Sequence, residues 1–285
     1  DYFKIEDKIA DCRWADVCYA DDELEGHKLD IYLPDTGKPS YKVVVLIYGS
    51  AWFANNMKQA AFQVFGKSLL DKGFAVVSIN HRSSGDAKFP AQINDVKAAI
   101  RFIRANAEKY KIDASFIGIT GFSSGGHLSA LAGTTNGVKA YTVGNTTVDI
   151  EGSVGAYGSF SSDVDAVVDW FGPIDMTRME NCNTTKGADS PEAALIGGAP
   201  ADHPEMLALL NPMTYLDVKD PKFLVIHGDA DTVVPNCQSI YFSDALKAKG
   251  LLEEFISVPG GQHGPVTFNE ATFKKMTEFF VKQSK

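Results

Sequence analysis

A serine flanked by glycines gives the strongest chemical signal in this amino-acid sequence. Residues 121–126 read Gly-Phe-Ser-Ser-Gly-Gly and contain the pattern G-x-S-x-G around Ser123. The apolar run at 116–120 predicts a buried strand just before this pattern, and helical periodicity follows it. A sharp turn from strand to helix exposes a serine hydroxyl for nucleophilic attack, and it requires small residues such as Gly121 and Gly125. We therefore predict that Ser123 is a catalytic nucleophile.

A serine hydroxyl is a weak nucleophile and needs a base, for which the sequence offers six histidines. His263 lies in the segment Gly-Gly-Gln-His-Gly, directly after the predicted strand 255–258. We predict that His263 is the base, because it follows the carboxyl end of a strand. His127 fits better as a helix-packing residue, and we expect His27 and His203 to be exposed in polar segments.

The base in turn needs a carboxylate that orients its ring. Two aspartates follow the predicted strand 223–226, in the segment His-Gly-Asp-Ala-Asp. Asp231 lies further beyond the strand end, and we predict that it reaches the loop of His263. Asp229 is the alternative acid, although its place beside the strand is more typical of a residue that caps the local turn.

Backbone amides near the nucleophile are expected to stabilise the oxyanion that forms in acyl transfer. The segment 48–52, Tyr-Gly-Ser-Ala-Trp, follows a run of β-branched residues that predicts an early strand. We predict that the amides of Ser50 and Ala51 act together with the amide of Ser124, which follows the nucleophile. Trp52 either forms a wall of the acyl pocket or packs against the segments that cover it.

Apolar runs of strand length alternate with helical patterns along the chain. This alternation predicts an α/β fold with a mainly parallel sheet and helices on both faces. Two segments, about 133–163 and 174–215, do not fit it, and we expect them to be lid or cap insertions of a single domain over 1–285. The predicted strands are 29–33, 43–48, 74–79, 116–120, 164–171, 223–226 and 255–258, and the predicted helices are 90–107, 127–132, 240–248 and 268–281.

The composition excludes several classes of function. The chain has 285 residues, of which 45% are hydrophobic, as in ordinary globular proteins. It carries 27 basic and 36 acidic residues and a formal net charge of −9, which disfavours nucleic acid, anionic membranes and polyanionic substrates. No apolar run approaches the roughly 20 residues that a membrane-spanning helix needs. Small neutral substrates remain compatible with this charge.

Four cysteines occur, without a CxxC pair or a histidine cluster of zinc spacing. Cys237 follows the predicted acid loop, and Cys182 lies in the insertion 174–215. Both follow strand ends at the same edge of the sheet, so a bridge between them could form in an oxidising compartment. Two free thiols are the alternative, and Cys12 and Cys18 would be the remaining possible pair.

With these motifs, the sequence resembles α/β-hydrolase esterases of the lipase and carboxylesterase superfamily. More narrowly, it is similar to bifunctional acetylxylan/feruloyl esterases and related carbohydrate esterases. The resemblance implies the α/β-hydrolase fold and a triad of Ser123, Asp231 and His263, in agreement with the argument from the residues. It is carried by the stretches 29–34, 48–52, 89–92 with Asp95, 121–128, 167–173, 190–192, 211–212, 227–235 and 263–264.

The sequence departs from this family in the oxyanion loop, which usually reads His-Gly-Gly before a small residue and Trp. Here Tyr48 replaces the histidine and Ser50 replaces a glycine. Since backbone amides form an oxyanion hole, the departure puts the geometry of the loop in doubt rather than its existence. The family's arginine matches Arg82, which we expect to form a structural ion pair with Asp95.

The expected reaction is hydrolysis of a carboxylic ester through an acyl-serine intermediate, with no metal and no organic cofactor. The resemblance alone implies the substrate, which would be acetyl or feruloyl esters on plant polysaccharide. Trp52, Phe122 and Trp170 are candidate substrate-binding residues, and they could equally belong to the core. The expected partners are therefore a small ester or an acylated oligosaccharide.

Two other functions share this fold, namely a peptidase and a non-catalytic ligand-binding homologue. A prolyl peptidase would need an additional large domain, for which the chain has no length, and a binding homologue would typically lack a member of the triad. We expect an exported protein, because the sequence starts without Met and because of the polysaccharide-esterase resemblance. The sequence predicts no oligomeric state.

Overall fold

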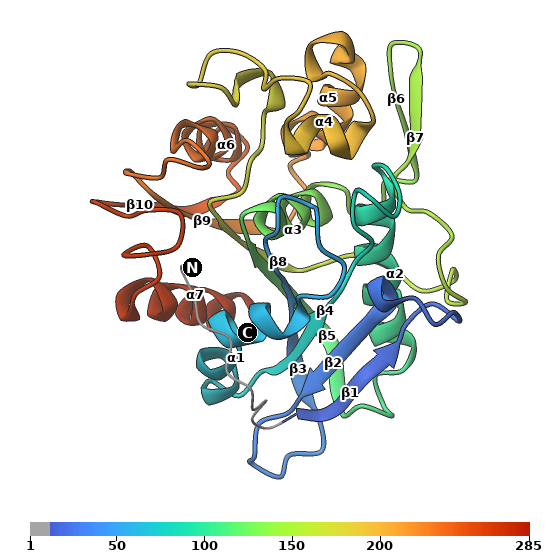
Figure 1. The fold of residues 1–285 in the computed structure, drawn as a ribbon. Coiled ribbons are helices and arrows are strands. Elements are labelled where there is room, and N and C mark those ends of the chain that lie inside the picture. The colour runs from blue at the N-terminus through green and yellow to red at the C-terminus, as the bar shows by residue number, and fades with distance from the viewer. Residues whose placement is uncertain (1–11) are drawn as a thin grey trace.

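A mainly parallel sheet of eight strands runs through the computed structural model, which describes residues 12–285 (Figure 1). Its strands are β1 Cys12–Cys18, β2 Lys28–Tyr32, β3 Tyr41–Ile47, β4 Ala75–Ile79, β5 Ile112–Phe122, β8 Ala166–Trp170, β9 Lys222–Gly228 and β10 Leu252–Val258. The spatial order is β1-β2-β4-β3-β5-β8-β9-β10. The pairs β1–β2 and β2–β4 are antiparallel, whereas every later pair is parallel. The predicted fold class is confirmed.

The central strands are apolar without interruption because both of their faces are buried. Along β3, Val43 and Val45 point into one hydrophobic core, while Val44 and Leu46 point into the core on the other face. Neighbouring side chains of a strand alternate between the two faces, so a continuous β-branched run serves both layers at once.

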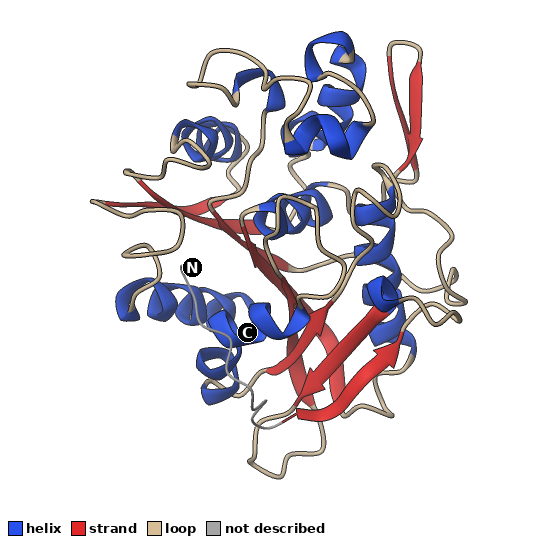
Figure 2. Cartoon of the chain, in the orientation of Figure 1, coloured by secondary structure: helices blue, strands red, loops and turns tan. Residues whose placement is uncertain are grey.

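Helices cover both faces of the sheet, as Figure 2 shows. One core contains side chains of α1 and α7, and the other contains side chains of α2, α3 and α6. None of the helices in the described residues is both long enough and apolar enough to cross a bilayer. The bounds are α1 Lys58–Asp71, α2 Ala91–Ala105, α3 Ser124–Thr134, α6 Cys237–Ala248 and α7 Glu270–Gln283.

The segments 133–163 and 174–215 contain short elements that the periodicity did not predict. The first holds a hairpin of β6 Ala140–Val143 and β7 Thr146–Asp149, and the second holds α4 Pro191–Ile196 and α5 Pro204–Leu210. Glu205 of α5 accepts hydrogen bonds from the Asn145 amide and the Thr146 hydroxyl at the tip of the hairpin. Single 3-10 turns occupy Glu25–His27, Met176–Arg178, Pro200–Asp202 and Pro212–Tyr215.

Helix α6 fastens the start of the segment 174–215 to the sheet. Cys237 forms a disulfide with Cys182, with a Cα–Cα distance of 6.1 Å. The buried Gln238 accepts from the amides of Ile174 and Asp175, and its side-chain amide donates to two carbonyls of the same segment. The predicted bridge is thus confirmed. The remaining possible pair, Cys12 with Cys18, does not form, because Cys18 is a free thiol. The side chain of Cys12 lies outside the described residues.

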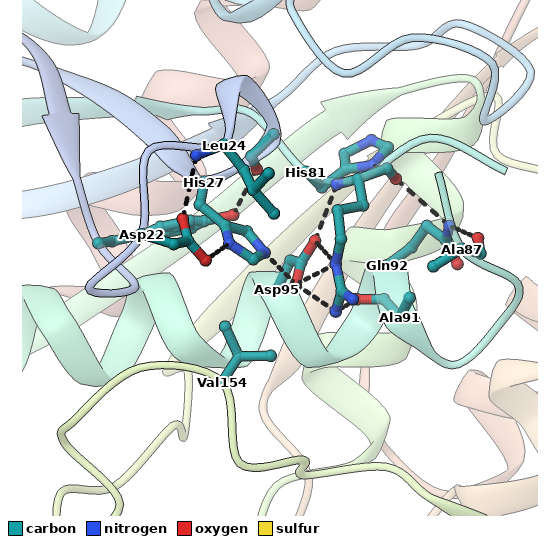
Figure 3. A network of polar contacts seen from close by, with 12 residues as sticks. Asp22, Leu24, His27, His81, Ala87, Ala91, Gln92, Asp95 and Val154 are labelled. Atoms are coloured by element: carbon teal, nitrogen blue, oxygen red, sulfur yellow. Dashed lines mark hydrogen bonds and ion pairs between the residues drawn. The ribbon is translucent and has the colours of Figure 1, made fainter. Parts of the chain in front are cut away.

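A buried ionic network holds the loop after β4 (Figure 3). The Asp95 carboxylate accepts from Arg82 Nε at 3.0 Å and Nη2 at 2.8 Å, which confirms the expected ion pair. Asp95 also lies 2.9 Å from His27 Nε2, and Asp22 lies 2.8 Å from the other ring nitrogen. His27 is buried, so the expectation that it would be exposed is wrong. The two carboxylates bond both nitrogen atoms of its ring and allow it to lie inside the fold. His203 is exposed, as expected.

We predict that replacing both bridged cysteines by serine will lower the free energy of unfolding by roughly 2–4 kcal/mol, because the bridge closes a long loop of the unfolded chain. The two cysteines are 55 residues apart. The measurement is denaturant unfolding of the double variant C182S/C237S, with C18S as the control that removes a free thiol. Four free thiols in the denatured, unreduced wild type would contradict the bridge.

The His27 network predicts a pH-dependent stability. Burial alone would lower the pKa of His27, but the hydrogen bonds and charges of Asp95 and Asp22 outweigh it and raise that pKa. A raised pKa in the folded state stabilises the fold below the unfolded value of about 6.5, and this contribution fades as pH rises through the folded pKa. The excess in melting temperature of the wild type over His27→Gln should therefore be largest in acid and shrink towards alkaline pH. A constant difference from acid to alkaline pH would refute this role.

Candidate active site

Ser123 occupies a strained turn between β5, which ends at Phe122, and α3, which begins at Ser124. Its backbone φ is 56° and its ψ is −123°, a conformation that L-residues rarely adopt. Its amide donates a hydrogen bond of 2.9 Å to the carbonyl of Trp170 on β8, which holds the strained turn in place. This is the geometry that the sequence predicted for an exposed nucleophile.

The glycines around Ser123 are required by crowding between backbones. A Cβ atom on Gly121 would collide with the carbonyl of Gly125, and a Cβ atom on Gly125 would collide with the carbonyl of Ile47 at the end of β3. A Cβ atom on Gly49 would collide with Phe122 and with Ser123 itself. The nucleophile turn and the loop after β3 are therefore in contact, and only glycines allow it.

His263 stands between Ser123 and Asp231. Its Nε2 atom lies 2.9 Å from Ser123 Oγ, and its Nδ1 atom lies 2.8 Å from Asp231 Oδ2. With the proton on Nδ1, the ring donates to the carboxylate and can accept the serine proton at Nε2. Gly260 and Gly264 have φ values of 70° and 110°, so the loop around His263 follows a path that favours glycine.

Asp231 is held by four hydrogen-bonding groups. Its Oδ1 atom accepts from the amides of Val233 at 2.8 Å and Val234 at 2.9 Å. Its Oδ2 atom faces His263 and also His227 Nε2, at 3.3 Å. Burial would raise the pKa of Asp231, but the hydrogen bonds from His227 and His263 outweigh it and hold that pKa well below its usual range. Asp231 is therefore a carboxylate that can orient His263 and stabilise its charged form.

The second histidine beside Asp231 was not anticipated from the sequence. His227 lies at the end of β9, and its Nδ1 atom is 2.6 Å from the Ser239 hydroxyl on α6. Since the serine can donate to Nδ1, the Nε2–H is left to donate towards the Val234 carbonyl, at 2.9 Å, and towards Asp231. The signal in the sequence that could have revealed this contact is the position of His227, four residues before Asp231.

Asp229, the alternative acid, does not reach the histidine. Its Oδ1 atom accepts a hydrogen bond of 2.7 Å from the amide of Gly260, and its own amide donates to Val258. It therefore stabilises the turns at the ends of β9 and β10, which is the turn-capping role that its position indicated.

The oxyanion loop differs from the prediction at one residue. The amide of Ser50 donates to the Ser124 hydroxyl at 2.9 Å, so it is not available to an oxyanion, and its assignment as a donor is wrong. The amides of Ala51 and Ser124 have no hydrogen-bond partner among the residues that the structure describes. Ala51 and Trp52 have φ values of 53° and 60°, which gives this loop an unusual course. Ala51 and Ser124 are thus the candidate donors.

Tyr48, which replaces the family's usual histidine, hydrogen-bonds the backbone of this loop. Its hydroxyl donates to the carbonyl of Ala54 at 2.9 Å, and its ring stacks on His81 with a centroid distance of 5.0 Å. The hydroxyl of Ser50 accepts from the amide of Ala54 at 3.1 Å. The two unusual residues therefore bind the same turn of the loop, which accounts for their joint presence.

Of the three predicted substrate-binding aromatics, only Trp52 lines the cavity beside Ser123. Its Nε1 atom donates to His127 Nδ1 at 3.2 Å, and His127 Nε2 donates to the Leu210 carbonyl at 2.8 Å. His127 is thus a packing residue, as predicted, and burial lowers its pKa to about 4. Phe122 and Trp170 are fully buried and pack on Phe65, Phe268 and other core aromatics. Their assignment to the substrate is therefore wrong.

A cavity of about 380 Å³ opens beside the nucleophile. This volume lies within the range of small-molecule sites. One part of the wall is apolar, and the other part is polar and comes from the segment 174–215. The apolar residues are Ala51, Trp52, Pro173, Met179, Pro191, Val233 and Val234, and the others, besides Ser123 and Ser124, are Glu180, Lys186, Gly187, Asp189, Ser190 and Glu192.

Ser123, Asp231 and His263 follow one another in this order along the chain, and they meet at the carboxyl edge of a mainly parallel sheet. This arrangement agrees with a known family. The family model described as BD-FAE matches residues 29–246. The chain belongs to the BD-FAE family of esterases. Curated relatives that match this chain are named as esterases.

Individual relatives agree with this family. The chain is 83% identical to a structure described as bifunctional GH43-CE from Bacteroides eggerthii, with a TM-score of 0.96 over 98% of this chain and 36% of that one. It is 59% identical to a truncated carbohydrate esterase from gut microbiota, with a TM-score of 0.94 over 95% of both chains. It is 31% identical over 238 residues to Esterase LipQ of Mycobacterium tuberculosis, which covers 82% of this chain and 53% of LipQ. The chain spans about half the length of the curated relatives it matches.

Proposed function

We propose that this BD-FAE family member hydrolyses carboxylic esters through an acyl-Ser123 intermediate. The observation that carries the proposal is the continuous line of hydrogen bonds from Ser123 through His263 to Asp231, beside an open cavity. Such a line supplies a base for a hydroxyl that is otherwise a weak nucleophile. The membership of an esterase family supports the same reaction.

In the first half of the reaction, His263 Nε2 takes the proton of Ser123 as its Oγ atom attacks the ester carbonyl. The negative charge that develops on the carbonyl oxygen is stabilised by the amides of Ala51 and Ser124, and the N-terminus of α3 adds a positive dipole. Asp231 stabilises the positively charged ring. The protonated His263 then gives its proton to the leaving alcohol, which leaves an acyl group on Ser123.

In the second half, water replaces the alcohol. His263 takes a proton from this water as its oxygen attacks the acyl carbon, and the same amides stabilise the second oxyanion. The bond to Ser123 Oγ breaks and the serine recovers its proton from His263, so the acid leaves and the site returns to its starting state. Each proton removed is returned, and no electron donor or acceptor is involved.

The proposed substrates are acetyl or feruloyl esters on plant polysaccharide or its oligosaccharides. The likeness to a carbohydrate esterase and to a GH43-CE protein supports a sugar ester over a simple lipid ester. The cavity volume of about 380 Å³ has room for a short acyl group together with part of a sugar. Steady-state hydrolysis of acetylated xylo-oligosaccharide, methyl ferulate and an aminoacyl anilide tests this, and cleavage of the anilide alone would favour a peptidase.

We further propose that the protein is exported. The bridge between Cys182 and Cys237 supports this location, because structural disulfides persist in oxidising compartments and are rare in reducing ones. A polysaccharide substrate outside the cell would agree with it.

Substitutions in the hydrogen-bonded line test the mechanism. Ser123→Ala should lower kcat by roughly 10⁴-fold or more with little change in melting temperature, because it removes only the nucleophilic oxygen. Asp231→Asn should lower kcat by roughly 10³–10⁴-fold, because an amide does not stabilise the charged ring of His263. Both effects are measured as steady-state kinetics on an aryl acetate.

The matched control for the acid is Asp229→Asn, because this residue lies in the same loop and bonds only to a turn amide. It should cost far less rate than Asp231→Asn. If Asp229→Asn were the more damaging of the two without unfolding, the acid would be misassigned. Retention of more than about a tenth of the wild-type rate in Ser123→Ala would exclude the acyl-serine route.

A further inference from the structure

A buried carboxyl group lies in the wall of the cavity that holds Ser123. Glu192 of α4 is only 4% exposed, and it lines this cavity. Its Oε2 atom has no hydrogen-bond partner among the residues that the structure describes. A buried polar atom without a partner destabilises a fold, and in the wall of a cavity a bound ligand can supply the missing hydrogen bond.

The neighbouring polar groups of the cavity do not satisfy this oxygen atom. Lys186, a cation in the same wall, forms an ion pair with Glu180 at 3.3 Å. The hydroxyl of Ser190 donates to the Gly187 carbonyl at 2.6 Å and accepts from the amide of Ala193 at 3.2 Å. Burial raises the pKa of Glu192, and its own backbone amide, the charge of Lys186 and the Ser190 side chain oppose this only in part.

The position of Glu192 is fixed by the elements around α4. The carbonyl of Leu195 accepts from the amide of Phe89 at 3.0 Å, and the carbonyl of Ala194 accepts from the ammonium group of Lys88 at 2.6 Å. Ser190 caps the first turn of the helix. These bonds join α4 to the loop after β4, so the backbone that carries Glu192 is held in place beside the cavity.

We propose that Glu192 is a specificity-determining residue that hydrogen-bonds a hydroxyl group of the substrate. This inference rests on the proposed ester hydrolysis and adds which part of the substrate the wall of the cavity recognises. A hydroxyl group fits because it can donate to a carboxylate or accept from a carboxylic acid.

Two parts of an acylated saccharide carry such a hydroxyl, namely the sugar ring and the phenol of a feruloyl group. Matched pairs of esters separate them. Methyl mono-O-acetyl-xyloside and cyclohexyl acetate differ in the sugar hydroxyls, whereas methyl ferulate and methyl 3-methoxycinnamate differ in the phenolic hydroxyl. The readout is the ratio of kcat/KM within each pair, measured for the wild type, Glu192→Met and Glu192→Gln.

In Glu192→Met the ratio should fall by about 10–100-fold in one of the two pairs, because a site built to bond a hydroxyl discriminates strongly against its absence. The pair that responds identifies the source of the hydroxyl. Glu192→Gln should lose less, since its amide can still bond a hydroxyl. The melting temperature of Glu192→Met should equal or exceed that of the wild type, because the substitution removes an unsatisfied buried oxygen.

The matched control is Glu205→Gln on α5, a carboxylate outside the cavity that bonds the β6–β7 hairpin, and it should leave both ratios unchanged. Unchanged ratios in Glu192→Met, equal losses on both members of a pair, or a marked fall in its melting temperature would each overturn the inference. If the wild type hydrolyses none of the four esters, the proposed function itself fails. Hydrolysis by the wild type with no effect of Glu192→Met overturns only the role of Glu192.

Discussion

The close approach of two backbones at the ends of β3 and β5 determines the geometry of the site. Gly49 and Gly125 lie where any Cβ atom would collide with the opposite segment. This contact keeps Ser123 in its strained turn, and it also places the loop of Ala51 beside the first amide of α3. The nucleophile and the two candidate oxyanion donors are therefore positioned by one steric constraint, which needs no movement at the moment of reaction.

Helix α6 couples the acid to the wall of the cavity. Its Ser239 orients His227, which contacts the same carboxylate oxygen of Asp231 as His263 does. Cys237 and Gln238, the two residues before Ser239, hold the chain that leads to Met179 and Glu180 in the cavity wall. The low pKa of Asp231 and the position of the wall thus depend on the same short stretch of helix, although they serve different steps of binding and catalysis.

The sequence predicts most of the sheet and the three residues of the hydrogen-bonded line, Ser123, His263 and Asp231, because both depend on local patterns. Continuous β-branched runs and strand-end loops can be read residue by residue. It does not predict α1, because Gly66 in its interior is unfavourable for a helix until the ring of Phe62 packs against it. The burial of His27, the use of the Ser50 amide by Ser124 and the core positions of Phe122 and Trp170 all depend on contacts between distant segments, which no local pattern contains.

Reaction and selectivity are supported by different parts of the molecule. Ser123, Asp231, His263 and the oxyanion amides all follow strands of the sheet, whose register is fixed by buried side chains on both faces. The polar wall of the cavity belongs to the segment 174–215, which α6 holds at one end and the loop after β4 holds through α4. That loop in turn depends on the ion pair between Arg82 and the buried Asp95. A substitution in the wall can therefore change which ester is bound without moving the Ser123–His263 distance, whereas a substitution at the glycines of the turn would displace the nucleophile and the amides together.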